Sequence, residues 1–159
     1  MPTRRGEPRW PARTVVDAMH ADQLREHGGL PGVRDENALE SALARPRQKW
    51  VYGEERDLAA LAAAYGFGMA KSHPYRDGNK RIALLTIATF LGVNGYDLDA
   101  TDADVVTTMV ATAAGRLSEA ELARWIQDHI ACGSPAAAAY RPFESTASAA
   151  RPPTGAAAC

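Results

Sequence analysis

Residues 58–94 read LAALAAAYGFGMAKSHPYRDGNKRIALLTIATFLGVN, and this stretch decides the fold. Two runs with few polar side chains, 58–72 and 82–93, flank the polar nonapeptide HPYRDGNKR at 73–81. A helix that is apolar all round is buried, because none of its sides is suited to face water. The alanines and glycines of the first run let neighbouring backbones come close. We therefore predict two buried central helices joined by a polar loop.

Local signals define the ends of these two helices. Asp57 precedes the first run and is a suitable N-cap, so that helix is predicted over 58–72. The second helix is predicted over 78–94, with Gly95 as the glycine that follows its C-terminus. Burying one Leu or Ile contributes roughly 1.5–3 kcal/mol, so the two helices can hold a strained polar loop between them.

Two helices are predicted before the central pair. Apolar residues at helical spacing predict them over 14–26 and 36–44. Asp35 is a suitable cap for the second, and Pro46 is expected to end it because proline interrupts the backbone hydrogen bonds of a helix. Residues 47–55 hold three large side chains before a glycine, and we expect either a short hairpin or a loop packed on the core.

Two more helices are predicted after the central pair. Residues 96–100 are expected to turn the chain. Capping-box signals then predict helices over 101–114 and 119–131. The last of these has a single apolar stripe, so it should cover the core from outside.

The two ends of the chain differ from its centre in composition. Residues 1–13 carry four arginines and three prolines and are predicted to be a flexible basic arm. Residues 133–159 are rich in Ala, Pro, Ser and Thr, have little to bury and are predicted to be a disordered tail. Between them, residues 14–132 are expected to form one domain. Its predicted class is all-α, a single-domain bundle of about six helices with the central pair inside.

Composition limits the class of function. The chain has 159 residues and a formal net charge of −1, so no overall field favours nucleic acid or an anionic membrane. The longest apolar runs are too short to span a bilayer, and no apolar segment follows the N-terminal charges as in a signal peptide. The two cysteines, Cys132 and Cys159, show no metal-ligand spacing. We expect a cytoplasmic protein that binds neither nucleic acid nor membrane directly.

The nonapeptide combines residue types that phosphate chemistry uses. Pro74 disfavours helical backbone for His73, so this imidazole is expected on extended chain just past a helix. There it can act as a general base for an attacking hydroxyl. Asp77 can hold Mg²⁺ through one carboxylate while phosphates supply other ligands, which is the usual arrangement for that ion.

An anion site is expected where the second central helix begins. Free N–H groups and the positive end of the helix dipole favour an anion at that place. Gly78 lets the backbone approach closely, and Asn79 can donate its amide to a phosphate oxygen. Lys80 and Arg81 can neutralise charge on a transferring phosphoryl group.

Structural roles remain open for the same residues. A histidine after a helix commonly caps it, and Asp-Gly-Asn is an ordinary turn. Two cations in a first helical turn oppose the helix dipole, which argues against a purely structural segment. Elsewhere, His20 and His27 lie seven residues apart and could share a metal, but no further ligand pattern joins them, so an ordinary polar role is favoured.

The nonapeptide resembles the Fic-family motif HxFx(D/E)GN(G/K)R in the form that the Doc branch carries. Tyr75 stands where the family usually has Phe, and Lys80 stands where AMP-transferring members have Gly. The second arginine that those members carry a turn later is absent, since Ile-Ala-Leu follows Arg81. The likeness covers roughly residues 15–130.

This resemblance implies an all-helical Fic/Doc fold and the toxin of a toxin–antitoxin pair. Doc-like toxins are protein kinases that transfer the γ-phosphate of ATP to a threonine of elongation factor Tu, a translation factor. By the resemblance, His73 is the base and Asp77 the Mg²⁺ ligand. The phosphate ligands are then Asn79, Lys80 and Arg81.

The resemblance also implies a separate inhibitor. Many Fic enzymes carry an inhibitory helix with the pattern (S/T)xxxE(G/N), to which this sequence has no full match. A Phd-like antitoxin that folds a segment into an apolar groove near the motif is therefore expected. Two other functions stay open: a nucleotidyl transferase that attaches AMP, and a non-catalytic binding module that acts through its antitoxin partner.

Overall fold

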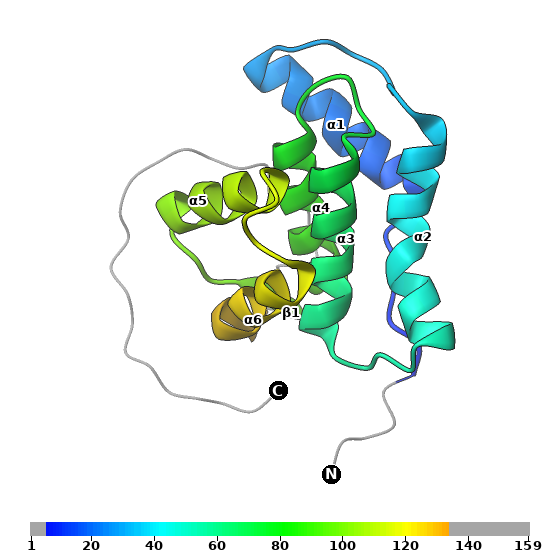
Figure 1. Cartoon of the computed structure of the whole chain (residues 1–159), viewed down its shortest axis with the longest axis vertical. Helices are drawn as coiled ribbons and strands as arrows, with labels where there is room; N and C mark the ends of the chain where they lie inside the picture. The colour runs from blue at the N-terminus through cyan, green and yellow to red at the C-terminus, as the bar shows by residue number, and fades with distance from the viewer. Residues whose placement is uncertain (1–5, 134–159) are drawn as a thin grey trace.

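The computed structural model describes residues 6–133, which are helical apart from one small sheet (Figure 1). The helices are α1 (Arg13–His27), α2 (Glu36–Tyr52), α3 (Leu58–Ser72), α4 (Asn79–Val93), α5 (Asp102–Ala113) and α6 (Glu119–His129). The strands are β1 (Tyr96–Leu98) and β2 (Ile130–Cys132). This arrangement confirms the predicted all-α bundle. Between residues 6 and 133, no helix combines the length and hydrophobicity that crossing a bilayer requires.

Helix α3 is the centre of the fold. Helix α2 lies along one side of it, and α4 and α6 pack on other sides (Figure 1). Eleven of its 15 residues are buried, among them the aromatic side chain of Tyr65. The prediction of a buried, Ala-rich central helix over 58–72 is therefore confirmed, including both of its ends.

Helix α4 is the second central helix, and it is less completely covered than expected. Its buried face includes Ile82, Ile87 and Phe90, which pack with residues of α3 in one hydrophobic core. Ala88 is exposed and Leu85 is half-buried, so the helix does have a side near water. Apolar residues lie on every side of α4, but the neighbouring elements do not cover every side.

Most of the predicted helix ends are confirmed. The side chain of Asp57 accepts a hydrogen bond from the N–H of Ala59, and Thr101 caps α5 in the same way. Ser118 and Glu121 form a reciprocal capping box at the start of α6. Gly95 follows α4 with a φ of 88°, a left-handed conformation that glycine adopts without strain.

Glycines bring α3 close to its neighbours. A Cβ atom on Gly66 would lie 2.3 Å from Cδ1 of Ile87 in α4. One on Gly68 would lie 3.2 Å from Cβ of Ala42 in α2. Carbon atoms in good contact are about 3.5–4.0 Å apart, so neither position has room for a side chain without movement. The close approach that the small residues predict is confirmed.

Helix α2 continues through Pro46, and the prediction that it ends there is wrong. The helix runs to Tyr52, so most of the segment expected to be a hairpin or a loop is helical. Pro46 removes one backbone N–H, but its ring is buried. Leu43 before it and Trp50 after it both pack on the core. Because this face lies against α3, its packing outweighs the lost hydrogen bond.

The antiparallel pair of β1 and β2 was not predicted. Tyr96 lies opposite Cys132 and Leu98 lies opposite Ile130. Strands of three residues are too short to show the alternation of apolar and polar residues by which strands are recognised. Because β2 begins at once, α6 ends at His129 and not at residue 131 as predicted.

Part of the predicted flexible arm lies against α4. The ring of Trp10 stacks on that of Phe90 with centroids 5.6 Å apart. The N–H of Arg9 donates to the side-chain oxygen of Asn94 over 2.9 Å, and the Asn94 amide donates back to the Arg9 carbonyl over 3.0 Å. Apart from Gly133, the predicted tail lies outside the described residues, as do residues 1–5.

The contact between Gly66 and Ile87 predicts a coupled pair of substitutions. We expect Gly66→Ala to destabilise the fold by about 1–3 kcal/mol, because the added methyl group overpacks the α3–α4 interface. Ile87→Val removes the Cδ1 atom that this methyl group would meet, and alone costs about 0.5–1.5 kcal/mol. The free energy of unfolding in urea should fall less in the double variant than the two single losses together, by at least about 0.5 kcal/mol. Strict additivity would contradict the packing described here.

Candidate active site

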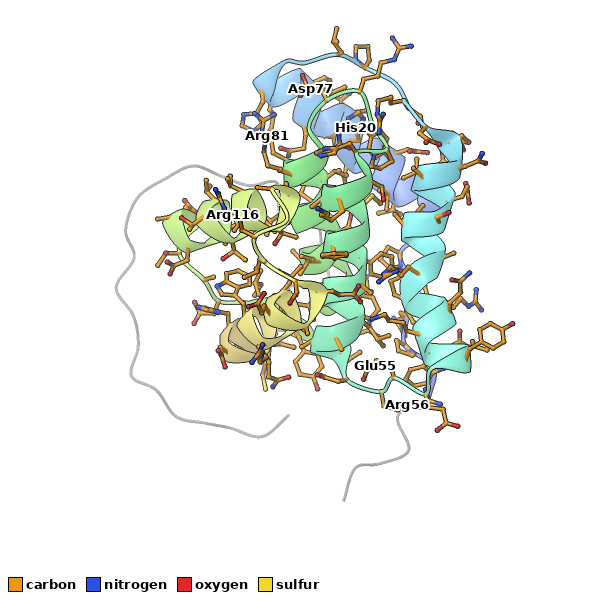
Figure 2. All side chains as sticks on the ribbon, in the orientation of Figure 1. His20, Glu55, Arg56, Asp77, Arg81 and Arg116 are labelled. Carbon is orange, nitrogen blue, oxygen red and sulfur yellow. The ribbon has the colours of Figure 1, made fainter. Side chains whose placement is uncertain are left out.

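The loop between α3 and α4, residues 73–78, is called the motif loop below. It lies at one end of the molecule, close to α1 and to the segment that leads into α2 (Figure 1). Asp77 and Arg81 from the nonapeptide lie at this end together with His20 of α1 (Figure 2). The tertiary structure therefore brings three separate parts of the chain to the predicted site.

His73 is exposed and has a left-handed backbone, with φ 46° and ψ 58°. The expectation of extended chain before Pro74 is therefore wrong. A left-handed conformation costs a residue other than glycine of order 1–3 kcal/mol, and it persists only where the surroundings impose it. Here the guanidinium of Arg34 donates to the carbonyls of His73 and Ser72, each over 2.8 Å. These bonds hold the turn and satisfy two carbonyls at the end of α3.

The segment 32–35 runs beside the motif loop. Val33 and Tyr75 form an isolated antiparallel bridge. The N–H groups of Arg34 and Asp35 donate to the carbonyl of Pro74 over 2.8 and 3.1 Å, and the N–H of Arg76 donates to Gly32 over 3.1 Å. Backbone groups of the motif loop thus bond to a segment some 40 residues earlier in the chain, at the entrance to α2.

Asn79 closes the motif loop. Its side-chain oxygen accepts from the N–H of Tyr75 and its amide donates to the carbonyl of Tyr75, both over 2.9 Å. The residue is buried, and both ends of its side chain are engaged. The structure therefore gives Asn79 a role in shaping the loop, and its contact with phosphate stays a prediction.

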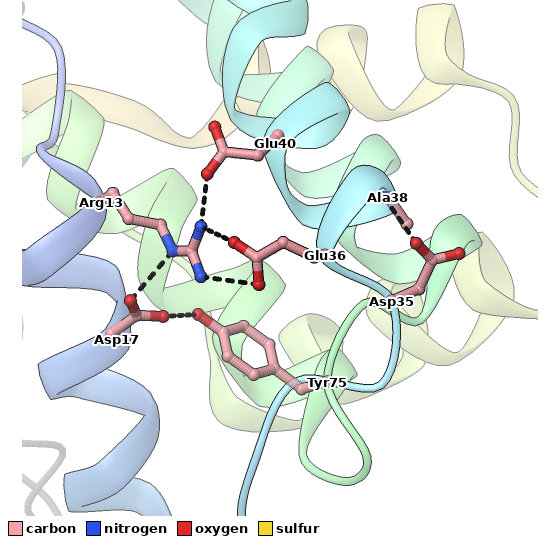
Figure 3. Close-up of polar contacts among 7 residues, drawn as sticks. All are labelled: Arg13, Asp17, Asp35, Glu36, Ala38, Glu40 and Tyr75. Atoms are coloured by element: carbon pink, nitrogen blue, oxygen red, sulfur yellow. Dashed lines mark hydrogen bonds and ion pairs between the residues drawn. The ribbon is translucent and has the colours of Figure 1, made fainter.

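Tyr75 ties the motif loop to a charged network between α1 and α2 (Figure 3). Its hydroxyl donates to Asp17 over 2.6 Å, and Asp17 accepts from Arg13 over 2.9 Å. Arg13 also bonds Glu36 and Glu40 of α2. Burial, together with the bond to Asp17, raises the pKa of the Tyr75 phenol well above its usual value, so the phenol stays protonated and donates. The hydrogen bonds that Arg13 donates to Glu36 raise the pKa of the Arg13 guanidinium, which keeps its charge.

Asp77 presents its carboxylate at the surface. Its Oδ1 accepts from the N–H of Gly78 over 2.8 Å. A Cβ atom on Gly29, just after α1, would lie only 2.7 Å from its Oδ2. Gly29 also has a φ of 128°, which side chains rarely tolerate, so only glycine suits this place beside the carboxylate.

The N-terminus of α4 has no side-chain cap. Gly78 is its N-cap, with φ 76°, and supplies no side-chain hydrogen bond; the first turn contains no acidic residue. Side chains cap α2, α3, α5 and α6, whereas α1, like α4, begins without such a cap. Lys80 and Arg81 in the first turn are both exposed. Free N–H groups with two cations beside them are suited to bind phosphate.

The residues of this site fit Mg²⁺ as a companion of phosphate. Over the described part of the chain, no three His, Cys, Asp or Glu side chains gather to hold a metal ion by themselves. The predicted alternative of a metal shared by His20 and His27 gains no third ligand. Asp77 is a single exposed carboxylate next to the α4 N-terminus, and Mg²⁺ commonly binds through one or two carboxylates plus substrate phosphates.

Sequence reasoning missed the residues that hold the motif loop from outside. These are Arg34, and Asp17 with Arg13; sequence reasoning also missed Gly29, which leaves room for the Asp77 carboxylate. The turn-rich segment GGLPGVRD at 28–35 is a signal that this connection has a special backbone. Such a signal does not show which part of the chain the segment contacts.

Comparison with known proteins finds the Fic/DOC family over residues 10–91, which include the whole motif loop. A relative named Protein kinase doc, from Escherichia phage P1, is 31% identical over 106 residues, 67% of this chain and 83% of the relative. Toxin Doc from Mycolicibacterium smegmatis is 45% identical over 80 residues, 49% of this chain and 60% of the relative. Both similarities support the resemblance drawn from the motif.

The hydrogen bonds of Arg34 predict that even a lysine at this position would leave the fold less stable. Arg34→Lys should lower the free energy of unfolding by about 1 kcal/mol, because one ammonium group cannot reproduce the planar fork that meets two carbonyls. Chemical unfolding in urea measures this loss. Arg124→Lys, an exposed arginine of α6, is the matched control and should change stability little. Equal stability of the two variants would show that Arg34 does not hold the turn.

Proposed function

This chain belongs to the Fic/DOC family, in the Doc branch of toxins from toxin–antitoxin systems, and we propose that it is a protein kinase. The proposed reaction transfers the γ-phosphate of ATP to a hydroxyl of a translation factor similar to elongation factor Tu, which arrests translation. The name of the phage relative, a protein kinase, supports this choice. A translation factor as target would place the activity in the cytoplasm.

The observation that carries the proposal is the uncapped first turn of α4, which the short motif loop joins to the exposed imidazole of His73. Gly78 leaves the N–H groups of this turn without a side-chain cap, and Lys80 and Arg81 bring two positive charges. His73 stands at the other end of the motif loop, and no side chain of the described residues bonds its ring. The motif loop can therefore supply a general base at one end and lead into a triphosphate-binding helix terminus at the other.

The proposed chemistry needs no covalent intermediate on the protein. His73 takes the proton of the target hydroxyl while that oxygen attacks the γ-phosphorus. The bond between the γ-phosphorus and the β–γ bridging oxygen breaks, and ADP leaves with the electron pair. Lys80 and Arg81 balance negative charge on the transferring group, since charge-assisted bonds are strongest where charge develops.

Mg²⁺ is the proposed cofactor, and Asp77 is the residue that would hold it. When bound with ATP, Mg²⁺ neutralises phosphate charge. The Asp77 carboxylate accepts from the Gly78 N–H and lies beside Gly29, which leaves room for it, and this place suits the role. Asn79 shapes the loop that carries the carboxylate, so its substitution should impair nucleotide binding even without a direct phosphate contact.

A partner protein is proposed to restrain the enzyme. Toxins of this kind are held by a cognate antitoxin, and we expect a small Phd-like protein to fill that role. The similarity to Toxin Doc of Mycolicibacterium smegmatis supports this proposal. Co-expression with the antitoxin should restore growth of cells that the toxin arrests.

His73→Ala tests the reaction. Purified protein is incubated with Mg·ATP and a bacterial lysate, with the label on the γ-phosphate or on the α-phosphate. We expect γ-label on one protein and a loss of about 100-fold or more in His73→Ala, because general bases contribute about 10²–10⁴-fold. His129→Ala is the matched control, since this histidine lies at the end of α6 and bonds the Trp125 carbonyl. It should keep the activity.

Other outcomes separate the alternatives. Transfer of α-label would show a nucleotidyl transferase and overturn the kinase proposal. Growth arrest by His73→Ala at the level of the parent, with no label transferred, would show a binding module that acts without catalysis.

A further inference from the structure

A buried imidazole of α1 lies next to the motif loop. His20 is 5% exposed, and its Nε2 lies 2.9 Å from the backbone carbonyl oxygen of Asp77. A carbonyl oxygen only accepts, so Nε2 carries the proton and donates. His20 lies within α1, one turn before Gln23. It is far in sequence from Asp77, whose carbonyl it bonds. Nothing in the sequence motif requires this contact.

The same helix holds the motif loop at a second place. The ring of His20 stacks on that of Tyr75 with centroids 3.8 Å apart and planes 17° from parallel. Tyr75 in turn donates its hydroxyl to Asp17 over 2.6 Å. Asp17 and His20 are three residues apart and so lie on one face of α1. That face holds the loop through the Tyr75 side chain and through the Asp77 backbone.

The hydrogen bond from His20 to the Asp77 carbonyl also affects the Asp77 carboxylate. Holding the carbonyl of Asp77 orients the peptide that follows, and the N–H of that peptide, on Gly78, bonds the Asp77 carboxylate over 2.8 Å. The backbone bond and the carboxylate bond therefore share one rigid peptide unit. A loop that lost the His20 bond would let this peptide turn and the carboxylate move with it.

We propose that His20 is a positioning residue: its Nε2–H holds the Asp77–Gly78 peptide so that the Asp77 carboxylate meets metal-bound ATP at the α4 N-terminus. This inference rests on the proposed function for the identity of the ligand. It differs from a purely structural role for His20, in which the stack on Tyr75 stabilises the loop and the hydrogen bond is incidental.

Two substitutions separate the hydrogen bond from the stack. His20→Gln keeps a donor close to the place of Nε2 and loses the aromatic ring. His20→Phe keeps a ring against Tyr75 and loses the donor. The probe is Mn²⁺·ATP, followed by electron paramagnetic resonance of the bound Mn²⁺. Binding of metal-free ATP in EDTA is the comparison and is measured by titration calorimetry, because this nucleotide carries no paramagnetic ion. Chemical unfolding in urea reports the stability of each variant.

We expect His20→Phe to weaken binding of Mn²⁺·ATP by about tenfold, which is the scale of one hydrogen bond, and to leave binding of metal-free ATP unchanged. His20→Gln should bind Mn²⁺·ATP within about threefold of the parent, even if it is the less stable of the two. In an Asp77→Asn background, His20→Phe should cause no further loss, because the carboxylate that it positions is gone.

Several results would overturn the inference. The first is parent-like binding of Mn²⁺·ATP by His20→Phe. The second is a loss of Mn²⁺·ATP affinity in both His20→Gln and His20→Phe that follows the loss of stability in each variant. If His20→Phe does not fold, His20→Asn takes its place, because its shorter amide cannot reach the Asp77 carbonyl. Failure of the unaltered protein to bind Mn²⁺·ATP would overturn the proposed function as well, whereas transfer of AMP in place of phosphate would leave the inference on His20 intact.

Discussion

The close packing of α3 against α4 is the constraint on which the rest of the structure depends. Gly66 leaves room for Ile87, so the two helices are held with little freedom to shift. Both ends of the motif loop are fixed by that contact, and the loop has only residues 73–78 with which to connect them. A short connection between two fixed ends has few conformations available, which allows it to keep the strained backbone of His73.

Bonds from other elements select one of those conformations. Arg34 holds the carbonyls at the end of α3, the segment 32–35 bonds the loop backbone, and α1 holds it through Tyr75 and Asp77. A single neutral hydrogen bond contributes only about 0.5–1.5 kcal/mol. Several of them on six residues, together with the buried Tyr75 ring, are enough to place the loop side chains within narrow limits.

The charges at this end of the molecule are divided between two tasks. Arg13 pairs with both Asp17 and Glu36 and so links α1 to α2, which contributes to the support of the loop (Figure 3). Lys80 and Arg81 are exposed in the first turn of α4, where the helix dipole disfavours cations. Cations in an unfavourable place are easier to explain by an anionic ligand than by stability, which agrees with the proposed binding of ATP.

The sequence by itself determined the helical class, both ends of α3, most caps and the nonapeptide, because these depend on residues close together in the chain. The sequence wrongly predicted that α2 ends at Pro46. Proline weakens a helix locally, whereas the packing that stabilises α2 comes from α3, which lies later in the chain. The backbone of His73 and the engagement of Asn79 were likewise decided only by the tertiary structure. Each depends on partners that no local pattern shows: Arg34 for the turn at His73, and the folded loop itself for Asn79. The nine consecutive residues of the nonapeptide supply the chemical groups of the site, but the geometry of the motif loop depends on contacts with residues up to 58 positions away in the chain.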